Sequence, residues 1–408
     1  MRPVSKPVLV LAGLMFLVGP LAAVARQGLT PLVFLVLLTL AVMPDVRAVW
    51  RAGFKAAWIP WAVPFFAWAC VSNAWAPKPQ WAEWGQMFAT VLAGVLVAGG
   101  VRALQRDDAQ RVLQAALIGV VILLVFLLEE SMSGAAVLSW VRPEDVQTSA
   151  ATFFSLIMSL AARGTSVLAV LGVLSAVLIY RRTQSTLAAA IFLLGAFYAC
   201  VSLPMTTSAL GLAAAIPAFL CVLWRPRFFW SAQLTVLAAV IVLAGPLAHL
   251  IPSQAHVDAA ESQLELGAQH RLGIWRHVSG LSDEKPLVGH GFNAARFFAS
   301  QQEKLEGLNL PALPTHPHNA PLQIWLELGA VGAALSAALI FGLWRASRPM
   351  MQRPVHAAIT ASMVAAASVI ACFSYAIWST WWLASLGLMA GLTALAFKTL
   401  PGQLAAPE

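Results

Sequence analysis

Charged residues are scarce in this sequence, and their scarcity excludes a soluble globular protein. Only 10% of the 408 residues are Asp, Glu, Lys or Arg, whereas a soluble domain carries about 25%. Hydrophobic residues make up 60% of the chain, and the mean hydropathy is +0.78. We therefore expect a polytopic membrane protein whose core is built against lipid.

Cysteine is rare as well, and its placement excludes two further classes of protein. All four cysteines lie inside apolar segments: Cys70, Cys200, Cys221 and Cys372. Their spacing fits neither a disulfide framework nor a metal site, so we interpret them as small packing residues. The sequence also has no internal repeat of the kind that builds solenoids.

Long apolar runs fill most of the chain. A spanning helix needs about 20 apolar residues, and the fold class that we predict is all-α, a bundle of about twelve transmembrane helices. The sixth run is too long for a simple span, and Gly164, beside Arg163, is expected to mark a break or a re-entrant start. The predicted spans are 8–25, 29–43, 57–73, 84–100, 111–128, 151–180, 186–203, 207–224, 230–251, 320–344, 355–375 and 379–397.

The net charge of +8 is explained by topology and does not call for a nucleic-acid partner. With the N-terminus in the cytoplasm, the inside segments hold 16 Lys and Arg residues and the short outside segments hold four. This is the bias of the positive-inside rule. It predicts cytoplasmic termini, helices 1–9 within residues 1–251, an external loop at 252–319, and helices 10–12 within 320–408.

The external loop is rich in histidine. Six of the eight histidines lie there: His256, His270, His277, His290, His316 and His318. Helical periodicity predicts one helix over 258–281 and a shorter one over 293–306. We expect the loop to form a small helical cap packed over the membrane domain.

The junction between this loop and the next apolar helix holds the strongest functional pattern. Asn319 is a plausible N-cap, and Pro321 suits the first helical turn. A helix N-terminus favours an anion, and imidazole titrates near neutral pH. His318 is thus a candidate general base, although a structural histidine remains an alternative. With His316 it forms His-x-His, but a third metal ligand with suitable spacing is lacking, so no metal is predicted.

Three arginines and one glutamate lie in apolar surroundings. Arg271 and Arg296, in the loop, either snorkel to the membrane surface or clamp a phosphate bidentately. Arg163 lies within a long apolar stretch, where a charge is a functional candidate by default. Glu327 lies nine residues into its helix and needs a partner or a water-filled cavity, so it could orient an arginine or histidine.

Two other loops allow a functional and a simpler interpretation. One carries tryptophans that either mark the membrane interface or stack on a sugar: Trp75, Trp81 and Trp84. The other carries carboxylates that are either solvated or form an acid/base pair of the glycosidase type: Glu129, Glu130, Glu144 and Asp145. The simpler interpretation is favoured in both cases.

The spacing of residues around His318 resembles a known family. His318-Asn319, nine residues, then Gly329-Ala-Val-Gly332 is similar to the signature of the O-antigen ligase family. The upstream segments 270–275 and 285–292 look like the same family's Arg-x-x-x-Trp and Pro-x-x-Gly-x-Gly segments, and Arg296 follows. The specific resemblance covers about residues 269–345.

This resemblance implies a lipid-linked glycan transferase of the bacterial inner membrane, with an inverting mechanism that needs neither metal nor cofactor. The donor would be a glycan on undecaprenyl diphosphate, and the acceptor a sugar of the lipid A core. Arg271 and Arg296 would bind the diphosphate and His318 would act as base. The residues assigned to substrate binding are Arg163, Trp275, His316, Asn319 and Glu327.

One departure from the family pattern concerns a membrane helix. The family often has Ser-Arg-x-x-x-Leu there, and the comparable segment 207–210 lacks the arginine. Arg163 is the candidate to supply that charge.

Related activities remain open: a polysaccharide polymerase, a protein O-oligosaccharyltransferase, or a transporter of lipid-linked sugar. A transporter predicts functional charges deep in several helices. Only Arg163 and Glu327 fit that description, so transport is disfavoured.

Overall fold

Helices make up nearly all the regular structure in the computed structural model, which describes residues 5–25, 27–53, 56–141, 150–203, 205–251, 266–305 and 309–402. The first part contains α1 (Lys6–Phe16), α2 (Val18–Val24), α3 (Leu29–Ala41), α4 (Pro44–Gly53), α5 (Ile59–Val71), α6 (Trp81–Gly100), α7 (Arg106–Ser133) and α8 (Ala136–Val141). The middle contains α10 (Ala150–Thr183), α11 (Thr186–Ser202), α12 (Thr206–Trp224) and α13 (Pro226–Ala248). The last part contains α15 (Leu266–Glu284), α16 (Ala295–Ser300), α17 (Ala320–Ser347), α18 (Pro354–Phe373) and α19 (Thr380–Thr399).

The predicted all-α membrane bundle is confirmed. Within the described ranges, nine helices are long and apolar enough to cross a membrane, and α3 with α4, bent by 105°, would make a tenth. A helix lies in each of the twelve predicted stretches, but α5 and α11 are short, and twelve spans are not confirmed. The protein is therefore a multi-pass membrane protein.

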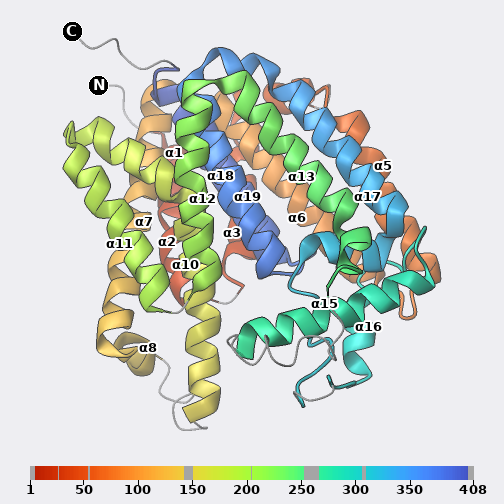
Figure 1. Cartoon of the computed structure of the whole chain (residues 1–408). Helices are drawn as coiled ribbons and strands as arrows, with labels where there is room; N and C mark the ends of the chain where they lie inside the picture. The colour runs from red at the N-terminus through yellow and green to blue at the C-terminus, as the bar shows by residue number, and fades with distance from the viewer. Residues whose placement is uncertain are drawn as a thin grey trace.

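The expected break at Gly164 is wrong. α10 runs without interruption from Ala150 to Thr183, about 50 Å at 1.5 Å per residue, which exceeds the roughly 30 Å of a bilayer core. Gly164 serves packing instead: a Cβ there would lie 3.3 Å from Leu123 and from Leu127 of α7. The surplus length extends α10 beyond its neighbours at one end of the bundle (Figure 1).

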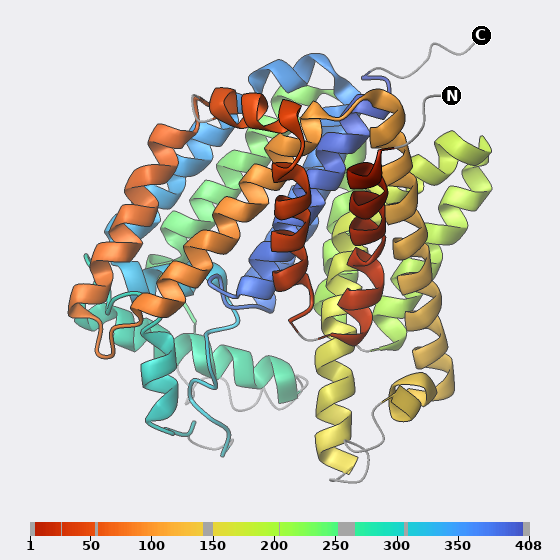
Figure 2. The ribbon, with the colours of Figure 1, turned by 180° about the vertical axis from the view of Figure 1, so that it is seen from behind.

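The two ends of the bundle differ. Both chain termini lie at one end, and α15 and α16 cover part of the other (Figure 1), an arrangement that Figure 2 shows from behind. α15 packs on α13 and α17 through a small apolar cluster that includes Ile274, Val278 and Leu326. The described part of the loop thus forms a helical cap on the bundle.

The predicted loop helices are only partly right. α15 begins at Leu266, the first residue described after 251, so the predicted start at 258 lies outside the described residues. α16 ends at Ser300, six residues before the predicted end. Gln302 adopts a left-handed φ of 57°, which does not continue a right-handed helix.

Candidate active site

The segment His316–Asn319 joins the cap to α17 and is fixed at its helical end. Asn319 is the N-cap, as predicted, and its side chain accepts a hydrogen bond from the backbone N–H of Leu322 at 3.1 Å. Pro321 occupies the first turn. His318 has a φ of 52°, a left-handed conformation that costs a non-glycine residue about 1–2 kcal/mol. Surrounding contacts must therefore hold the histidine in place.

One of these contacts is the backbone carbonyl of Ser374, just after α18, which holds both imidazoles. His318 Nδ1 lies 2.8 Å and His316 Nε2 2.9 Å from this oxygen. Because a carbonyl oxygen only accepts hydrogen bonds, each ring must donate its N–H there. His318 is therefore the Nδ1–H tautomer, which leaves a lone pair on Nε2. Among the described residues, the hydrogen bond of the His318 ring uses Nδ1 and not Nε2.

Both imidazoles are kept neutral. Burial is the main cause that lowers the pKa of His318 to about 4; repulsion from His316, Arg271 and His270 in their protonated forms adds to the shift, and the hydrogen bond to Ser374 opposes it. Burial also lowers the pKa of His316, and the charge of Arg296 adds to the effect. At neutral pH His318 is consequently an unprotonated base.

Two arginines approach the histidines from different helices. On α15, Arg271 is half-buried and close enough for its charge to act on His318. On α16, Arg296 is exposed and its charge acts on His316. Trp275, one turn after Arg271, donates from Nε1 to the carbonyl of Pro317 at 3.0 Å. Two guanidinium groups beside neutral imidazoles suit an anionic ligand such as a diphosphate.

α17 is interrupted at Gly329, and residues 286–291 fill the interruption. Gly329 has φ 65° and ψ −164°, far from helical values. Four backbone hydrogen bonds of 2.8–3.1 Å cross the break: Ala330 N to Pro286 O, Val331 N to Leu287 O, His290 N to Leu326 O and Gly291 N to Glu327 O. The inserted segment thus satisfies backbone groups that the break would leave unpaired at membrane depth.

Glycine is required where this segment meets α17. A Cβ on Gly289 would lie 2.4 Å from the carbonyl oxygen of Glu327, and a Cβ on Gly329 would lie 2.4 Å from that of Leu287. Both glycines also have a left-handed φ, of 67° and 65°. Gly289 and Gly329, one from each sequence motif, therefore allow the backbone of residues 286–291 to pack directly against the backbone of α17.

The carboxylate of Glu327 connects the chain after the inserted segment with the segment that holds the histidines, through hydrogen bonds. It is fully buried, and its Oε2 accepts hydrogen bonds from Asn293 N at 2.9 Å and from the Trp378 indole. Its Oε1 accepts from Gln323 Nε2 at 3.0 Å and from Ala295 N at 3.4 Å. Asn293 and Ala295 begin the turn of chain that carries Arg296, and Trp378 belongs to the connection that carries Ser374. One carboxylate therefore links the arginine side of the site to the histidine side.

Arg163 lies in a polar cluster behind that connection. Its guanidinium is 5.0 Å from the centroid of the Trp381 indole. Tyr375, next to Ser374, donates its hydroxyl to Ala162 at 2.7 Å and lies 3.0 Å from Ser166 Oγ. Ser166 in turn lies 3.2 Å from Ser208. α10 thus meets α12 at the segment that lacks the expected arginine, and a binding role for Arg163 stays a prediction.

The structure brings most of the predicted site residues to one end of the bundle. His316, Asn319, Trp275 and Glu327 make contacts within the protein that shape the site, and their contact with substrate stays a prediction. Three contributors were not predicted from the sequence: Gln323, Ser374 and Trp378. Gln323 also accepts from the backbone N–H of Ile377 at 3.0 Å. Among the described residues, no group of three His, Cys, Asp or Glu side chains is arranged to hold a metal.

The two loops with alternative interpretations contribute packing. Trp75 donates to the carbonyl of Gly289 at 3.1 Å and so supports the inserted segment. Trp81 is exposed, which leaves it open to either interpretation. Glu130 accepts from the backbone N–H of Leu138 at 3.0 Å and stabilises α8, whereas residues 142–149, with Glu144 and Asp145, lie outside the described residues.

Comparison with known proteins agrees with the motif. Residues 194–337 match the sequence profile of a family described as O-antigen ligase. This part of the chain is therefore similar to the O-antigen ligase family. Arg271, Arg296, His318 and Glu327 lie inside the matched residues, whereas Arg163 and Ser374 lie outside them.

Curated proteins that are similar to part of this chain include several from Rickettsia. Proteins named "Putative polysaccharide ligase" from Rickettsia typhi and Rickettsia bellii are each 35% identical over 121 residues. These alignments cover 29% of this chain and 30% and 29% of the two relatives. A protein of the same name from Rickettsia felis is 32% identical over 133 residues, or 31% of this chain and 32% of its own. The match thus spans about a third of the relatives' length.

Proposed function

We propose that this protein is a glycosyltransferase that moves a glycan from undecaprenyl diphosphate to a sugar of the lipid A core in lipopolysaccharide biosynthesis. The observation that carries the proposal is the pairing of Ser374 with His318. This hydrogen bond leaves the Nε2 lone pair free on a neutral imidazole, with Arg271 and Arg296 nearby. A base beside two diphosphate-binding groups is what transfer from a lipid diphosphate requires.

The reaction would be an inverting displacement in which each group has one task. The acceptor hydroxyl gives its proton to His318 Nε2 while its oxygen attacks the anomeric carbon from the side opposite the diphosphate. The glycosyl C–O bond to the diphosphate breaks, and its electron pair stays on the leaving oxygen. Arg271 and Arg296 stabilise that negative charge. No metal ion or cofactor takes part in this scheme.

Donor binding would also raise the pKa of the His318 imidazole. The charge of Arg271 is one cause of the low pKa of His318. An anionic diphosphate bound beside this arginine offsets its charge and so raises the pKa of His318 toward its ordinary value. The imidazole then becomes a stronger base only when the donor is present.

We further propose that the site faces the periplasm and that both termini are cytoplasmic. The inside segments hold 16 Lys and Arg residues against four in the short outside segments, and the termini lie at the opposite end from α15 and α16. In this orientation the site lies at the outer boundary of the inner membrane, where a lipid-anchored diphosphate would reach it.

The decisive experiment supplies one donor and several acceptors. Purified full-length protein receives glycan-loaded undecaprenyl diphosphate together with lipid A–core, a second lipid-linked glycan, or an acceptor protein. Transfer to lipid A–core is expected, and it should survive a chelator. Transfer only to the second glycan or only to the protein would identify a polymerase or a protein glycosyltransferase instead. Without transfer to any acceptor, the enzymatic proposal fails.

A further inference from the structure

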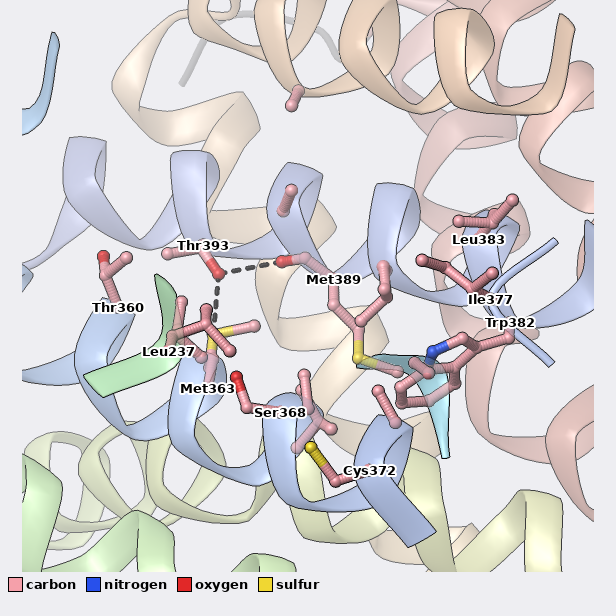
Figure 3. Close-up of a pocket in the computed structure, with 18 of the residues that line it drawn as sticks. Leu237, Thr360, Met363, Ser368, Cys372, Ile377, Trp382, Leu383, Met389 and Thr393 are labelled. Carbon is pink, nitrogen blue, oxygen red and sulfur yellow. Dashed lines mark hydrogen bonds between the residues drawn. The ribbon is translucent and has the colours of Figure 1, made fainter. Parts of the chain in front are cut away.

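The connection between α18 and α19, residues 374–379, holds the histidines but has empty space on one side. Cys372, just before it, and Ile377, within it, line an apolar cavity of about 580 Å³ together with Trp382 of α19 (Figure 3). A cavity lacks the neighbouring atoms that fix a close-packed segment. The conformation of the connection therefore depends on its hydrogen bonds.

Backbone N–H groups anchor the connection at two places. At its start, the N–H of Ser374 donates to the carbonyl of Ile370 at 2.9 Å and so continues the last turn of α18. Further along, the N–H of Ile377 donates to the Gln323 side chain of α17 at 3.0 Å. Tyr375 lies between these two anchors and directly follows the residue whose carbonyl holds both imidazoles.

The side chain of Tyr375 supplies a third anchor, on a different helix. Its hydroxyl donates to the carbonyl of Ala162 on α10 at 2.7 Å and lies 3.0 Å from Ser166 Oγ. Its ring packs edge-on against Trp381, with 4.6 Å between the centroids and an interplanar angle of 88°, and lies 5.4 Å from the ring of Trp382. Tyr375 thus joins the start of the connection to α10.

This anchor acts on the carbonyl that holds the imidazoles. The carbonyl of Ser374 and the Cα of Tyr375 belong to one planar peptide unit, so a shift of Tyr375 displaces the carbonyl oxygen with it. That oxygen lies 2.8 Å from His318 Nδ1 and 2.9 Å from His316 Nε2. A displacement of about 1 Å away from the rings would stretch both contacts beyond the roughly 3.2 Å limit of an N–H···O hydrogen bond.

We propose that Tyr375 is a positioning residue for the base, acting through the Ser374 carbonyl and not through contact with substrate. The inference rests on the proposed function, because it takes His318 as the base. The tyrosine hydroxyl holds the carbonyl where His318 must keep its proton on Nδ1 and its lone pair on Nε2. Without the hydroxyl, the connection gains freedom toward the cavity. The neutral imidazole can then carry its proton on Nε2, where it cannot accept another.

Tyr375→Phe tests this proposal, because phenylalanine keeps the ring and removes only the hydroxyl. The Ala162 carbonyl keeps a side-chain donor in this variant, since Ser166 Oγ also donates to it at 2.7 Å. Tyr198→Phe is the matched control, because Tyr198 is an exposed tyrosine on α11. A further variant carries 4-aminophenylalanine at position 375, which restores an N–H donor in place of the hydroxyl.

Transfer kinetics, measured per amount of folded full-length protein, give the first readout. Replacing the acceptor that fixes the tautomer of the catalytic histidine in a serine protease lowers kcat by about 10⁴. Loosening the Ser374 carbonyl should lower kcat at least tenfold in Tyr375→Phe. The KM for donor should stay within twofold, because the arginines lie on α15 and α16. The control should match wild type, and 4-aminophenylalanine should recover most of the lost kcat.

Three kinetic results would overturn the proposal: a wild-type kcat in Tyr375→Phe, a raised KM for donor with an unchanged kcat, or no recovery with 4-aminophenylalanine. The second result would assign the tyrosine to the arginine side of the site. The third would show that the ring environment matters and the hydrogen bond does not.

The tautomer itself gives a second readout, which needs no substrate. Nitrogen NMR of protein with isotope-labelled histidine distinguishes protonated from unprotonated ring nitrogens, and His318→Gln identifies the signals of His318. Wild type at neutral pH should show the Nδ1–H form, and Tyr375→Phe should show a larger share of the Nε2–H form. Identical His318 signals in the two proteins would refute the inference. If wild type transfers no glycan, the proposed function fails, and the NMR comparison still decides whether Tyr375 positions His318.

Ser374→Gly covers the case in which Tyr375→Phe does not fold. Glycine gives the backbone more freedom, so it should loosen the same carbonyl without altering the hydroxyl groups around Tyr375. The share of the Nε2–H form of His318 should rise in this variant as well. A His318 spectrum identical to that of wild type would contradict the proposal.

Discussion

Replacing Glu327 by glutamine should loosen the site, because its carboxylate holds several segments of the site together through hydrogen bonds. The carboxylate accepts four hydrogen bonds, two on each oxygen, and all four partners are donors. A glutamine keeps one accepting oxygen and presents an NH₂ group in place of the other. If the NH₂ takes the Oε2 position, it faces Asn293 N–H and the Trp378 indole. In the Oε1 position it faces Ala295 N–H and the amide of Gln323.

The magnitude follows from counting the donors that lose their acceptor. Either orientation leaves two buried donors unsatisfied, and each costs about 1–3 kcal/mol. A total of about 3 kcal/mol corresponds to roughly a hundredfold increase in local opening, since about 1.4 kcal/mol equals a factor of ten. The turn at Asn293–Ala295 should bear much of this cost, because it precedes the arginine on α16. Arg296 should then be positioned less well, and the KM for donor should rise more than kcat falls.

Hydrogen exchange measured by mass spectrometry tests this reasoning. Amides in 290–300 should exchange about a hundredfold faster in Glu327→Gln, while amides in the middle of α7 should not change. Glu83→Gln is the matched control, because the Glu83 side chain is exposed in the first turn of α6. Unchanged exchange in 290–300, or donor kinetics that match wild type, would refute the positioning role of Glu327.

Three further predictions concern the arginines, the inserted glycine and acid stability. Arg271→Lys and Arg296→Lys should each raise the KM for donor at least tenfold, because lysine lacks the bidentate fork; normal donor kinetics would exclude a diphosphate contact. Gly289→Ala should lower the melting temperature through its clash and left-handed φ, whereas Gly280→Ala, which meets nothing within 4 Å, should not; equal stability would contradict the docked insertion. His318 has a folded pKa of about 4 against about 6.5 unfolded, so its contribution is present above pH 6.5 and falls by about 3 kcal/mol toward pH 4. Wild type should therefore lose more thermal stability on acidification than His318→Gln, and parallel losses would count against the burial of a neutral imidazole.

The sequence was sufficient for features that depend on local patterns. Within the described residues, apolar runs located the nine helices that are long enough to span a membrane to within a few residues, and Asn319 followed by Pro321 identified the start of α17. The motif around His318 also selected residues that the structure links by hydrogen bonds, and their role in catalysis stays a prediction. These features depend on residues that are close together in the chain, where helix caps and hydrophobic runs have clear physical signatures.

The sequence was insufficient where distant segments meet. Ser374 acts through a backbone carbonyl, which any residue type supplies, and it lies 56 residues from His318. The role of Gly329 depends on the inserted segment 286–291, about 40 residues upstream. The spacing from His318 to Gly329 could therefore be recognised as a motif, but its structural reason could not be inferred from the sequence. Gly164 was misinterpreted because a glycine that packs against a neighbouring helix and a glycine that breaks its own helix look alike in sequence.

The central claim is that His318 takes the acceptor proton while the arginines hold the diphosphate. The most direct measurement compares wild type with His318→Ala for glycan transfer to lipid A–core and, in parallel, for binding of undecaprenyl diphosphate. The variant should lose transfer by at least a hundredfold and keep donor binding within a fewfold of wild type. Transfer by His318→Ala at close to the wild-type rate would contradict the account.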